Sequence, residues 1–329
     1  MRWLRIIAVA FFLLAAATWW LFTRPITIAS DGFVFISPST TVVHAVDSVN
    51  AHCELTSPWL VKITARIVAR VTSRTVQAGW YKFNPTHTQL DVLRALFSGD
   101  KRPTVRVTIP EGSTYRTIAS ILARDVQCDS AAFVRWCESD SICTVYGASE
   151  ASMEGYLKPD TYEFFWRTDP SRIGDRMAQA FQTMWRNECE GRLKQTGYTR
   201  HEIVTLASIV QAETGANAEM PRIAGVYLNR LSLGMRLEAD PTVQYGLGIK
   251  RRLLYSDLNK PHAYNTYAHT GLPPGPINNP GLSALLASLE PESHNYIFFV
   301  ARGDESGLHN FARTGAEHAL NVKRYRATR

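Results

Sequence analysis

The sequence has few of the residues that mark metal, redox or nucleic-acid chemistry. Only five of its 329 residues are cysteine, and no two of them have the C-x-x-C spacing of a redox or zinc motif. It contains no RNA-binding aromatic signature and no arginine-rich arm. The sequence therefore predicts no metal, no other cofactor and no nucleic-acid partner, although its net charge of +7 suits an anionic surface or polymer.

Two hydrolase motifs are incomplete. His201 and Glu202 open like a zinc-protease signature, but Thr205 occupies the place of the second histidine. Ser208 lacks the G-x-S-x-G context of a nucleophilic serine. The chain also lacks internal repeats and low-complexity tracts, and its 45% hydrophobic content predicts a packed core. Its length allows about two domains.

The amino terminus carries the one long apolar run. Residues 6–22 contain no charge, Arg2 and Arg5 precede them, and residues 25–61 contain no Lys or Arg. Seventeen residues just span a bilayer core. The positive-inside rule then predicts a cytoplasmic tail at residues 1–5 and a transmembrane anchor at residues 6–24, with the body outside the cytoplasm.

A cleaved signal peptide is the alternative for this segment, because Ala15, Ala16 and Ala17 form a small-residue site. The apolar run continues past that site through two tryptophans, which favours the anchor. Both interpretations export the body of the chain.

Exported cysteines can form disulfides, and three of the five lie between positions 128 and 143. Buried free thiols are the alternative, and the sequence does not decide between them.

Residues 25–104 are predicted to form a small α+β module. Strand-like runs at 33–36 and 78–83 flank helical patterns at 58–74 and 88–99. Thr88 and Asp91 have the spacing of a capping box, and Gly99 is a stop signal. In the 58–74 segment two rows of residues have helical spacing. The apolar row consists of Leu60, Ile63, Ile67 and Val71. The basic row consists of Lys62, Arg66, Arg70 and Arg74. The basic row is interpreted either as a solvated helix face or as a contact for anionic lipid or glycan.

A polar interruption at residues 99–103 marks the predicted domain boundary. Helical patterns dominate residues 105–329, with a strand-like run at 105–109, so this part is predicted to be a larger mixed α+β domain. One of its helices begins at Thr199 with Glu202 as capping-box partner. Its apolar face ends at Glu213, next to the negative end of the helix dipole.

A carboxyl group at that position is expected to have a raised pKa, because burial and the helix dipole both disfavour its charged form. A raised pKa suits a general acid near neutral pH. The alternative is an ion pair between Glu213 and a basic residue such as Arg222 or Arg230, and the pattern alone leaves both open.

The sequence around Glu213 favours the general-acid role over the ion pair. The segments ASIVQAET (207–214), VYLNRLSLGMRLEADPTVQYGLG (226–248), YNTYAHTGLPPGPINNPG (264–281) and YIFFVA (296–301) strongly resemble the endolytic murein transglycosylase family, also called MltG or YceG-like. AGWYKF (78–83), IPEG (109–112) and EGYLKPDTY (154–162) support the resemblance over nearly the whole chain. The family motif has two glutamates around one residue; the second, catalytic one falls on Glu213, and Gln211 replaces the first.

The resemblance implies a membrane-anchored lyase with a LysM-like module at residues 25–104 and a catalytic domain at residues 105–329. It implies an inner-membrane protein, single-pass, with a periplasmic catalytic domain that cleaves peptidoglycan glycan strands internally, and synthases as partners. Glu213 would protonate the glycosidic oxygen and then act as base for the sugar's own 6-hydroxyl, leaving a 1,6-anhydro end. The expected role is termination of nascent strands. A non-catalytic cell-wall binding or scaffolding protein is the alternative.

Polar and aromatic residues in the loop-rich region after Glu213 are expected to line the glycan cleft. They are Asp240, Gln244, Tyr245, Asn265 and Tyr267. Support of turns and of the core is an equally open interpretation for each. If Asp240 lies near Glu213, a two-carboxylate hydrolase also becomes arguable.

Overall fold

The computed structural model describes residues 2–148 and 152–328 of the chain. Met1, at the start of the predicted cytoplasmic tail, and Arg329, at the end of the predicted catalytic domain, lie outside the described residues. The chain forms two compact units, one of residues 1–105 with 163–168, the other of residues 106–162 with 169–329. Segment 163–168 therefore belongs to the first unit although it lies far along the chain.

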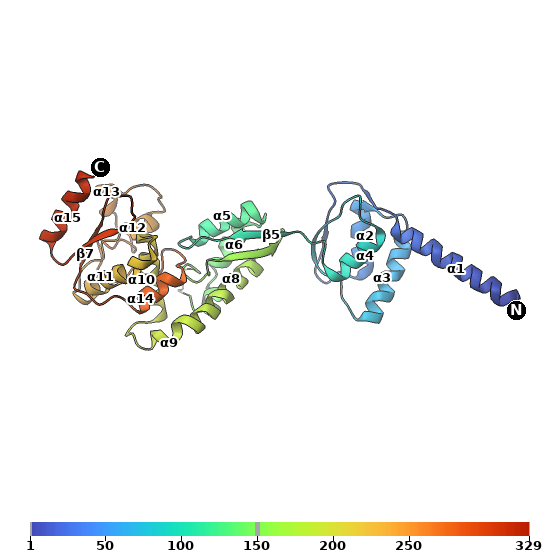
Figure 1. The fold of residues 1–329 in the computed structure, drawn as a ribbon, viewed down its shortest axis with the longest axis horizontal. Helices are drawn as coiled ribbons and strands as arrows, with labels where there is room; N and C mark the ends of the chain where they lie inside the picture. The colour runs from blue at the N-terminus through green and yellow to red at the C-terminus, as the bar shows by residue number, and fades with distance from the viewer. Residues whose placement is uncertain (1, 149–151, 329) are drawn as a thin grey trace. The chain divides into compact units, whose positions relative to one another are not determined.

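The first unit contains an amino-terminal helix and a small module of helices and short strands (Figure 1). Its elements are α1 (Arg2–Thr23), β1 (Thr27–Ile28), β2 (Phe33–Ile36), α2 (Val42–His52), β3 (Cys53–Glu54), α3 (Pro58–Thr72), β4 (Gly79–Lys82) and α4 (Gln89–Ser98). Strands β1 and β3 pair antiparallel, as do β2 and β4. The mixed α+β character predicted for this part of the chain is present.

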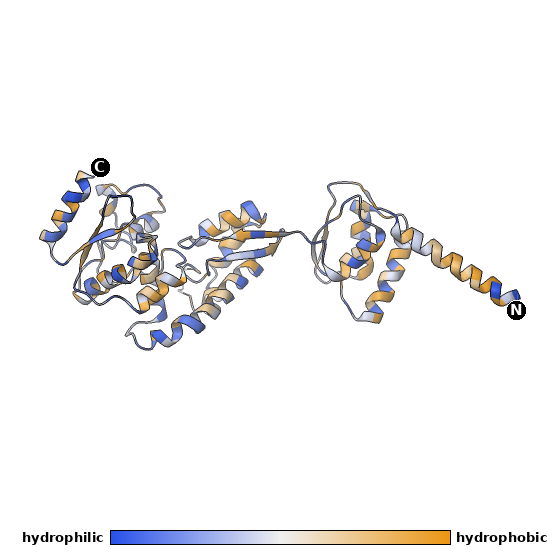
Figure 2. Ribbon diagram, in the orientation of Figure 1, coloured by the Kyte–Doolittle hydropathy of each residue, from blue (hydrophilic) through white to orange (hydrophobic). Residues whose placement is uncertain are grey.

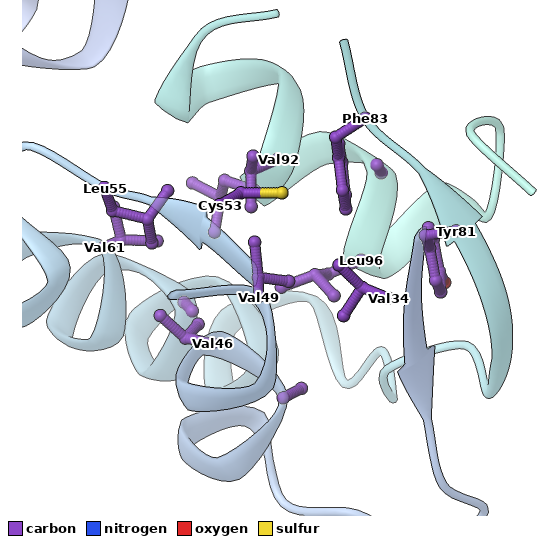
Figure 3. Close-up of a cluster of buried hydrophobic side chains, with 14 of the residues drawn as sticks. Val34, Val46, Val49, Cys53, Leu55, Val61, Tyr81, Phe83, Val92 and Leu96 are labelled. Atoms are coloured by element: carbon purple, nitrogen blue, oxygen red, sulfur yellow. The ribbon is translucent and has the colours of Figure 1, made fainter. Parts of the chain in front are cut away.

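The core of this module lies between its strands and helices. Strand β2 alternates, so that Val34 and Ile36 are buried while Phe35 is exposed. Figure 3 shows Val34 and Tyr81 from the paired strands beside valines of α2 and Leu96 of α4. The predicted capping box of Thr88 and Asp91 is confirmed at the start of α4, and Gly99 ends that helix in a left-handed conformation.

Helix α1 is 22 residues long, and none of its described residues is buried. It is long enough and apolar enough to cross a membrane, and the ribbon of α1 has hydrophobic colouring over most of its length, apart from its two ends (Figure 2). Its end is attached to the module, because Phe22 packs on the core and Gln89 Nε2 donates a hydrogen bond to the Leu21 carbonyl oxygen at 2.7 Å.

Helix α3 forms where the sequence predicts it, but the predicted apolar row does not face the core. Val61 and Ala65 are the buried residues of α3, whereas Ile63, Ile67 and Val71 are exposed. The helix lies against α2 through small and β-branched residues. The larger apolar row therefore points away from this contact.

The rest of the chain, from residue 104 onward, is mostly helical and belongs to the second unit, apart from residues 104–105 and 163–168. From the end of α4 the elements are β5 (Thr104–Thr108), α5 (Tyr115–Asp125), α6 (Ser130–Cys137), α7 (Asp140–Tyr146), β6 (Thr161–Phe165), α8 (Pro170–Met184), the π-helix η1 (Trp185–Cys189), α9 (Glu190–Leu193), α10 (Arg200–Glu213), the 3-10 helix η2 (Asn217–Glu219), α11 (Met220–Ser232), α12 (Asp240–Leu247), α13 (Tyr255–Leu258), α14 (Leu282–Leu289), β7 (Phe298–Ala301), β8 (His309–Ala312) and α15 (Gly315–Ala327). Strands β5 and β6 pair, and β7 pairs antiparallel with β8. All five cysteines of the chain are free and buried, in agreement with the buried-thiol alternative.

Helix α10 is the central element of this unit. Residues 203–210 are all buried, because α11, α12 and α14 pack around the helix. The loop before α14 closes over it. In that loop the Ile277 N–H donates to Ser208 Oγ at 3.0 Å, and Asn278 Nδ2 donates to the Ser208 carbonyl oxygen at 2.7 Å. Ser208 is thus a structural residue of α10.

Candidate active site

The carboxyl end of α10 positions Glu213. Thr199 and Glu202 form the predicted capping box at the start of this helix, and Glu213 is its last residue. Thr214 then leaves the helix in an extended conformation. The side chain of Glu213 is partly buried and sits where the helix dipole disfavours negative charge.

Tyr227 of α11 is the hydrogen-bond partner of Glu213. Its hydroxyl donates to Glu213 Oε1 at 2.6 Å, and its ring is buried against Phe299 of β7, edge to face at 5.8 Å. Burial is the largest influence on Glu213 and raises its pKa to about 7. The Tyr227 hydrogen bond acts in the opposite direction, while the charge of Asp240 raises the pKa further.

The alternative that Glu213 forms an ion pair is not what the structure contains. Arg222 pairs with Glu292 at 2.9 Å, and Arg230 pairs with Glu238 at 3.1 Å. Arg230 also donates from Nε to the carbonyl oxygen of Ile297 at 2.7 Å. Its charge contributes only the last of the effects that lower the pKa of Glu213. The carboxyl is therefore free to take up and release a proton near neutral pH.

Asp240 begins α12 and has its own tyrosine partner. The Tyr267 hydroxyl donates to Asp240 Oδ1 at 2.7 Å. Burial first, and then the bond to Asp240, raise the pKa of the Tyr267 hydroxyl, so it remains a donor at neutral pH. The site therefore contains two carboxyl groups, each held by a tyrosine hydroxyl, and the second group acts electrostatically on the first.

A cavity of about 620 Å³ lies next to the backbone that carries these two residues, although Glu213 and Asp240 are not themselves among its lining residues. Ala212 and Pro241, the chain neighbours of Glu213 and Asp240, are both on its wall, as are Gln244 and Tyr245. The other residues on the wall are Gly112, Thr114, Tyr115, Arg116, Thr117, Ser120, Glu154, Gly246, Gly248, Ile249, Lys250, His262, Tyr264, Ile277 and Asn278. Its volume is in the usual range for ligand pockets, and its mixture of tyrosines, amides and cations suits a sugar.

Glu154 is a residue of this cavity that the sequence analysis did not select. Its side chain is buried, and Oε1 accepts hydrogen bonds from the Tyr115 N–H at 3.0 Å and from Asn279 Nδ2 at 2.9 Å. Burial raises the pKa of Glu154 to about 8, against the lowering effect of hydrogen bonds that include one with Tyr245. The signal available in the sequence was the position of Glu154 at the start of EGYLKPDTY.

Tyr227 was also missed. It lies in the VYLNRL segment, where an aromatic residue at helical spacing looks like any core residue. Only the approach of α11 to the end of α10 brings its hydroxyl to Glu213. A buried tyrosine needs a partner for its hydroxyl, and here the carboxyl is that partner.

Of the remaining predicted cleft residues, Asn265 supports a loop and Gln244 lies on the cavity wall. Asn265 is buried, donates from Nδ2 to the carbonyl oxygens of Leu258 and Lys260, and accepts from the Tyr267 N–H at 3.0 Å. These contacts hold the loop that carries Tyr267. Gln244 lines the cavity and donates to the Arg251 carbonyl oxygen at 2.9 Å.

Gln211, which replaces a family glutamate, has a clear structural contact. Its Oε1 accepts a hydrogen bond from the Gly281 N–H at 2.9 Å, and a carboxylate oxygen at this position would serve the same donor. His201 is bonded through Nδ1 to the Tyr156 hydroxyl and through Nε2 to the Pro274 carbonyl oxygen. Within residues 2–148 and 152–328, no group of three His, Cys, Asp or Glu side chains is arranged to hold a metal ion.

Comparisons with known proteins find relatives that share one name. The endolytic murein transglycosylase of Bacillus subtilis (strain 168) is 31% identical over 267 residues, which are 76% of this chain and 73% of that protein. The protein of the same name from Streptococcus pneumoniae (strain D39) is 26% identical over 279 residues. The match covers 75% of this chain but only half the length of the pneumococcal protein.

A solved structure has the same fold. The crystal structure of a yceG-like protein from Listeria monocytogenes matches with a TM-score of 0.62 and 27% identity, and it covers 88% of this chain and 98% of its own. The model of the YceG-like family matches residues 34–324, which contain Glu213 and the whole cavity wall. By sequence and by fold, this chain belongs to the YceG-like family.

Proposed function

We propose that the protein is a membrane-anchored lytic transglycosylase that cuts peptidoglycan glycan strands internally. The bond cut lies between N-acetylmuramic acid and N-acetylglucosamine, and the new end is a 1,6-anhydro sugar. The observation that carries the proposal is the Glu213 carboxyl, whose pKa is raised to about 7 and whose chain neighbour Ala212 lines a cavity of about 620 Å³. The names of the Bacillus and Streptococcus relatives support the substrate class.

The proposed reaction uses one carboxyl twice. Protonated Glu213 gives its proton to the glycosidic oxygen as the bond from that oxygen to the anomeric carbon breaks. The Glu213 carboxylate then accepts the proton of the sugar's 6-hydroxyl while the 6-oxygen bonds to the anomeric carbon. The leaving sugar carries the first proton and Glu213 recovers the second, so no water is consumed.

The neighbouring groups have separate tasks in this scheme. The Tyr227 hydroxyl supports the carboxylate form of Glu213 between the two proton transfers, because it donates to Oε1. Asp240, fixed by Tyr267, supplies negative charge near the developing positive charge of the sugar ring. Gln244 and Tyr245 contact the glycan, and Asn265 holds the loop of Tyr267.

The rest of the chain is assigned by the same proposal. Residues 6–24 anchor the protein in the inner membrane, with residues 1–5 in the cytoplasm and residues 105–329 as a periplasmic catalytic domain. Helix α1 supports the anchor by its length and apolar surface. Residues 25–104 form a LysM-like module that contacts glycan. Peptidoglycan synthases are the partners, because an internal cut in a nascent strand ends its synthesis.

The deciding experiment is digestion of purified glycan strands in isotopically labelled water. We expect new muramic acid ends that are anhydro sugars without label, since the 6-oxygen replaces water. Labelled reducing ends would instead mean that Asp240 activates water, as in an inverting hydrolase. An unchanged strand-length distribution would identify a binding protein without catalytic activity.

A further inference from the structure

The outer face of α3 carries a row of apolar side chains that are exposed in the described part of the first unit. Its members, with their exposed fractions, are Trp59 (63%), Ile63 (45%), Ile67 (57%) and Val71 (77%). They repeat every four residues and so form one continuous row along the 15-residue helix. Four large exposed apolar residues in a row exceed what scattered surface positions ordinarily show.

A basic row runs beside this apolar row. Arg66, Arg70 and Arg74 are exposed, and none of them forms an ion pair with any residue in the described part of the chain. Lys62 at the start of the row pairs with Asp47 of α2. Figure 2 shows hydrophobic and hydrophilic residues mixed along the ribbon of α3, in contrast to the mainly hydrophobic colouring of α1. A solvated helix face accounts for the exposed arginines but not for the exposed apolar row beside them.

The position of α3 relative to α1 is set by contacts within the first unit. Phe22 packs on the module core, and Gln89 Nε2 holds the Leu21 carbonyl oxygen at 2.7 Å. The Arg24 guanidinium lies 3.7 Å from the ring centre of Trp20, a pair suited to a membrane interface. In the view of Figure 1, α3 runs across the direction of α1. Helix α4 contacts both α1 and α3, so a bilayer that α1 crosses lies close to α3.

We propose that α3 docks on the anionic lipid surface of the membrane that anchors the protein. The proposal rests on the anchor assigned above to α1. Trp59 and the isoleucines enter the headgroup region, while the arginines extend to lipid phosphates. The two rows complement the two parts of an anionic lipid surface, the basic row its phosphates and the apolar row the region below them. Docking would hold the module against the bilayer and limit how the first unit turns about its anchor.

The test uses the full chain reconstituted through α1 into vesicles. Ile67→Cys is labelled with an environment-sensitive fluorophore, and a lipid carrying a quencher in its headgroup region is added. The five native cysteines are buried, so the new thiol is the accessible one. Asp100→Cys, in the exposed turn after α4, is the matched control in the same unit. Vesicles contain phosphatidylcholine with phosphatidylglycerol, or phosphatidylcholine alone.

We expect quenching and a blue shift at position 67 but not at position 100, with the effect lost in phosphatidylcholine alone. Arg70→Gln should lower the ratio of docked to undocked protein about fivefold, whereas Arg94→Gln on α4 should leave it unchanged. Equal quenching at positions 67 and 100 in anionic vesicles would overturn the proposal. So would protection of position 67 by glycan strands, or by dimers of the chain, without lipid quenching.

Flotation of the vesicles separates this proposal from the ones on which it depends. A chain that floats with the vesicles yet shows no quenching at position 67 overturns the docking alone. A chain that does not float overturns both the anchor and the docking. Cleavage of glycan strands, measured on the same preparation, reports on the proposed activity independently of either result.

Discussion

The hydroxyl of Tyr227 lies 2.6 Å from Oε1 of Glu213, and this contact lowers a pKa that burial raises. Together with the charges of Asp240 and Arg230, these two effects leave the carboxyl with a pKa of about 7. A group poised there exists in both protonation states under ordinary conditions. The two-step use of Glu213 proposed here needs both states.

Tyr227→Phe tests this balance through the pH profile of glycan cleavage. Loss of the hydrogen bond should raise the pKa of Glu213, so the alkaline limb of the profile should move up by about one pH unit. The rate at its optimum should also fall, because the carboxylate loses support. A lower rate with an unmoved alkaline limb would assign Tyr227 a packing role only.

Glu213→Gln should reduce glycan cleavage by at least about 100-fold, because an amide keeps the shape but cannot donate and recover a proton. Glycan binding, measured by co-sedimentation with intact strands, should remain near that of the unaltered protein. Glu202→Gln, at the other end of α10, is a useful control because it alters only a helix cap. Substantial cleavage by the Glu213 variant would remove this residue from the mechanism.

The same variant should change how stability depends on pH. The folded-state pKa of Glu213 is raised from the ordinary 4.5 to about 7, so the folded protein holds this proton more tightly than the unfolded chain. Its favourable contribution is complete below pH 4.5 and is lost as the pH rises through 7. The Tm of Glu213→Gln minus the Tm of the unaltered protein should therefore be larger at pH 8 than at pH 5. An equal difference in Tm at both pH values would contradict the raised pKa.

Glu154→Gln should retain most cleavage activity at pH 7, because burial raises the pKa of Glu154 to about 8 and its carboxyl is mainly neutral there. The amide oxygen still accepts from the Tyr115 N–H and from Asn279. Glu154→Leu removes the one oxygen that accepts both hydrogen bonds and should destabilise the protein by about 1–3 kcal/mol for each buried donor left unpaired. Thermal unfolding and strand-length analysis of both variants distinguish a neutral carboxyl from a required charge. Complete inactivity of the Gln variant with normal stability would indicate the charge.

Gln211→Glu should be tolerated, since a carboxylate oxygen also accepts the hydrogen bond of the Gly281 N–H. A second charge in the last turn of α10 should raise the pKa of Glu213 slightly. Gln211→Ala leaves the Gly281 N–H unpaired and should lower stability more than Gln211→Glu does. Steady-state cleavage and Tm measure both effects; inactivation by Glu alone would show that the amide is essential.

Local signals in the sequence determined where several elements begin and end. Both predicted capping boxes, at Thr88 and at Thr199, start helices of the structure, and Gly99 ends one. These features depend on hydrogen bonds between residues three positions apart, which the sequence specifies directly. The expectation of a raised pKa at Glu213 also came from local information, namely an apolar helix face that ends in a carboxyl group.

Tertiary structure decided which groups face one another. Helix α3 has two apolar rows, and periodicity does not tell which one finds a partner; packing on α2 buried Val61 and Ala65 and left Ile67 exposed. Glu154 meets Asn279 across 125 positions of the chain, and Tyr227 reaches Glu213 only because α11 folds back on α10. The pKa of a carboxyl depends on burial and on donors brought from distant segments. The sequence therefore singled out Glu213 as the proposed acid, while the fold brought Tyr227 to its carboxyl group and placed the cavity next to Ala212.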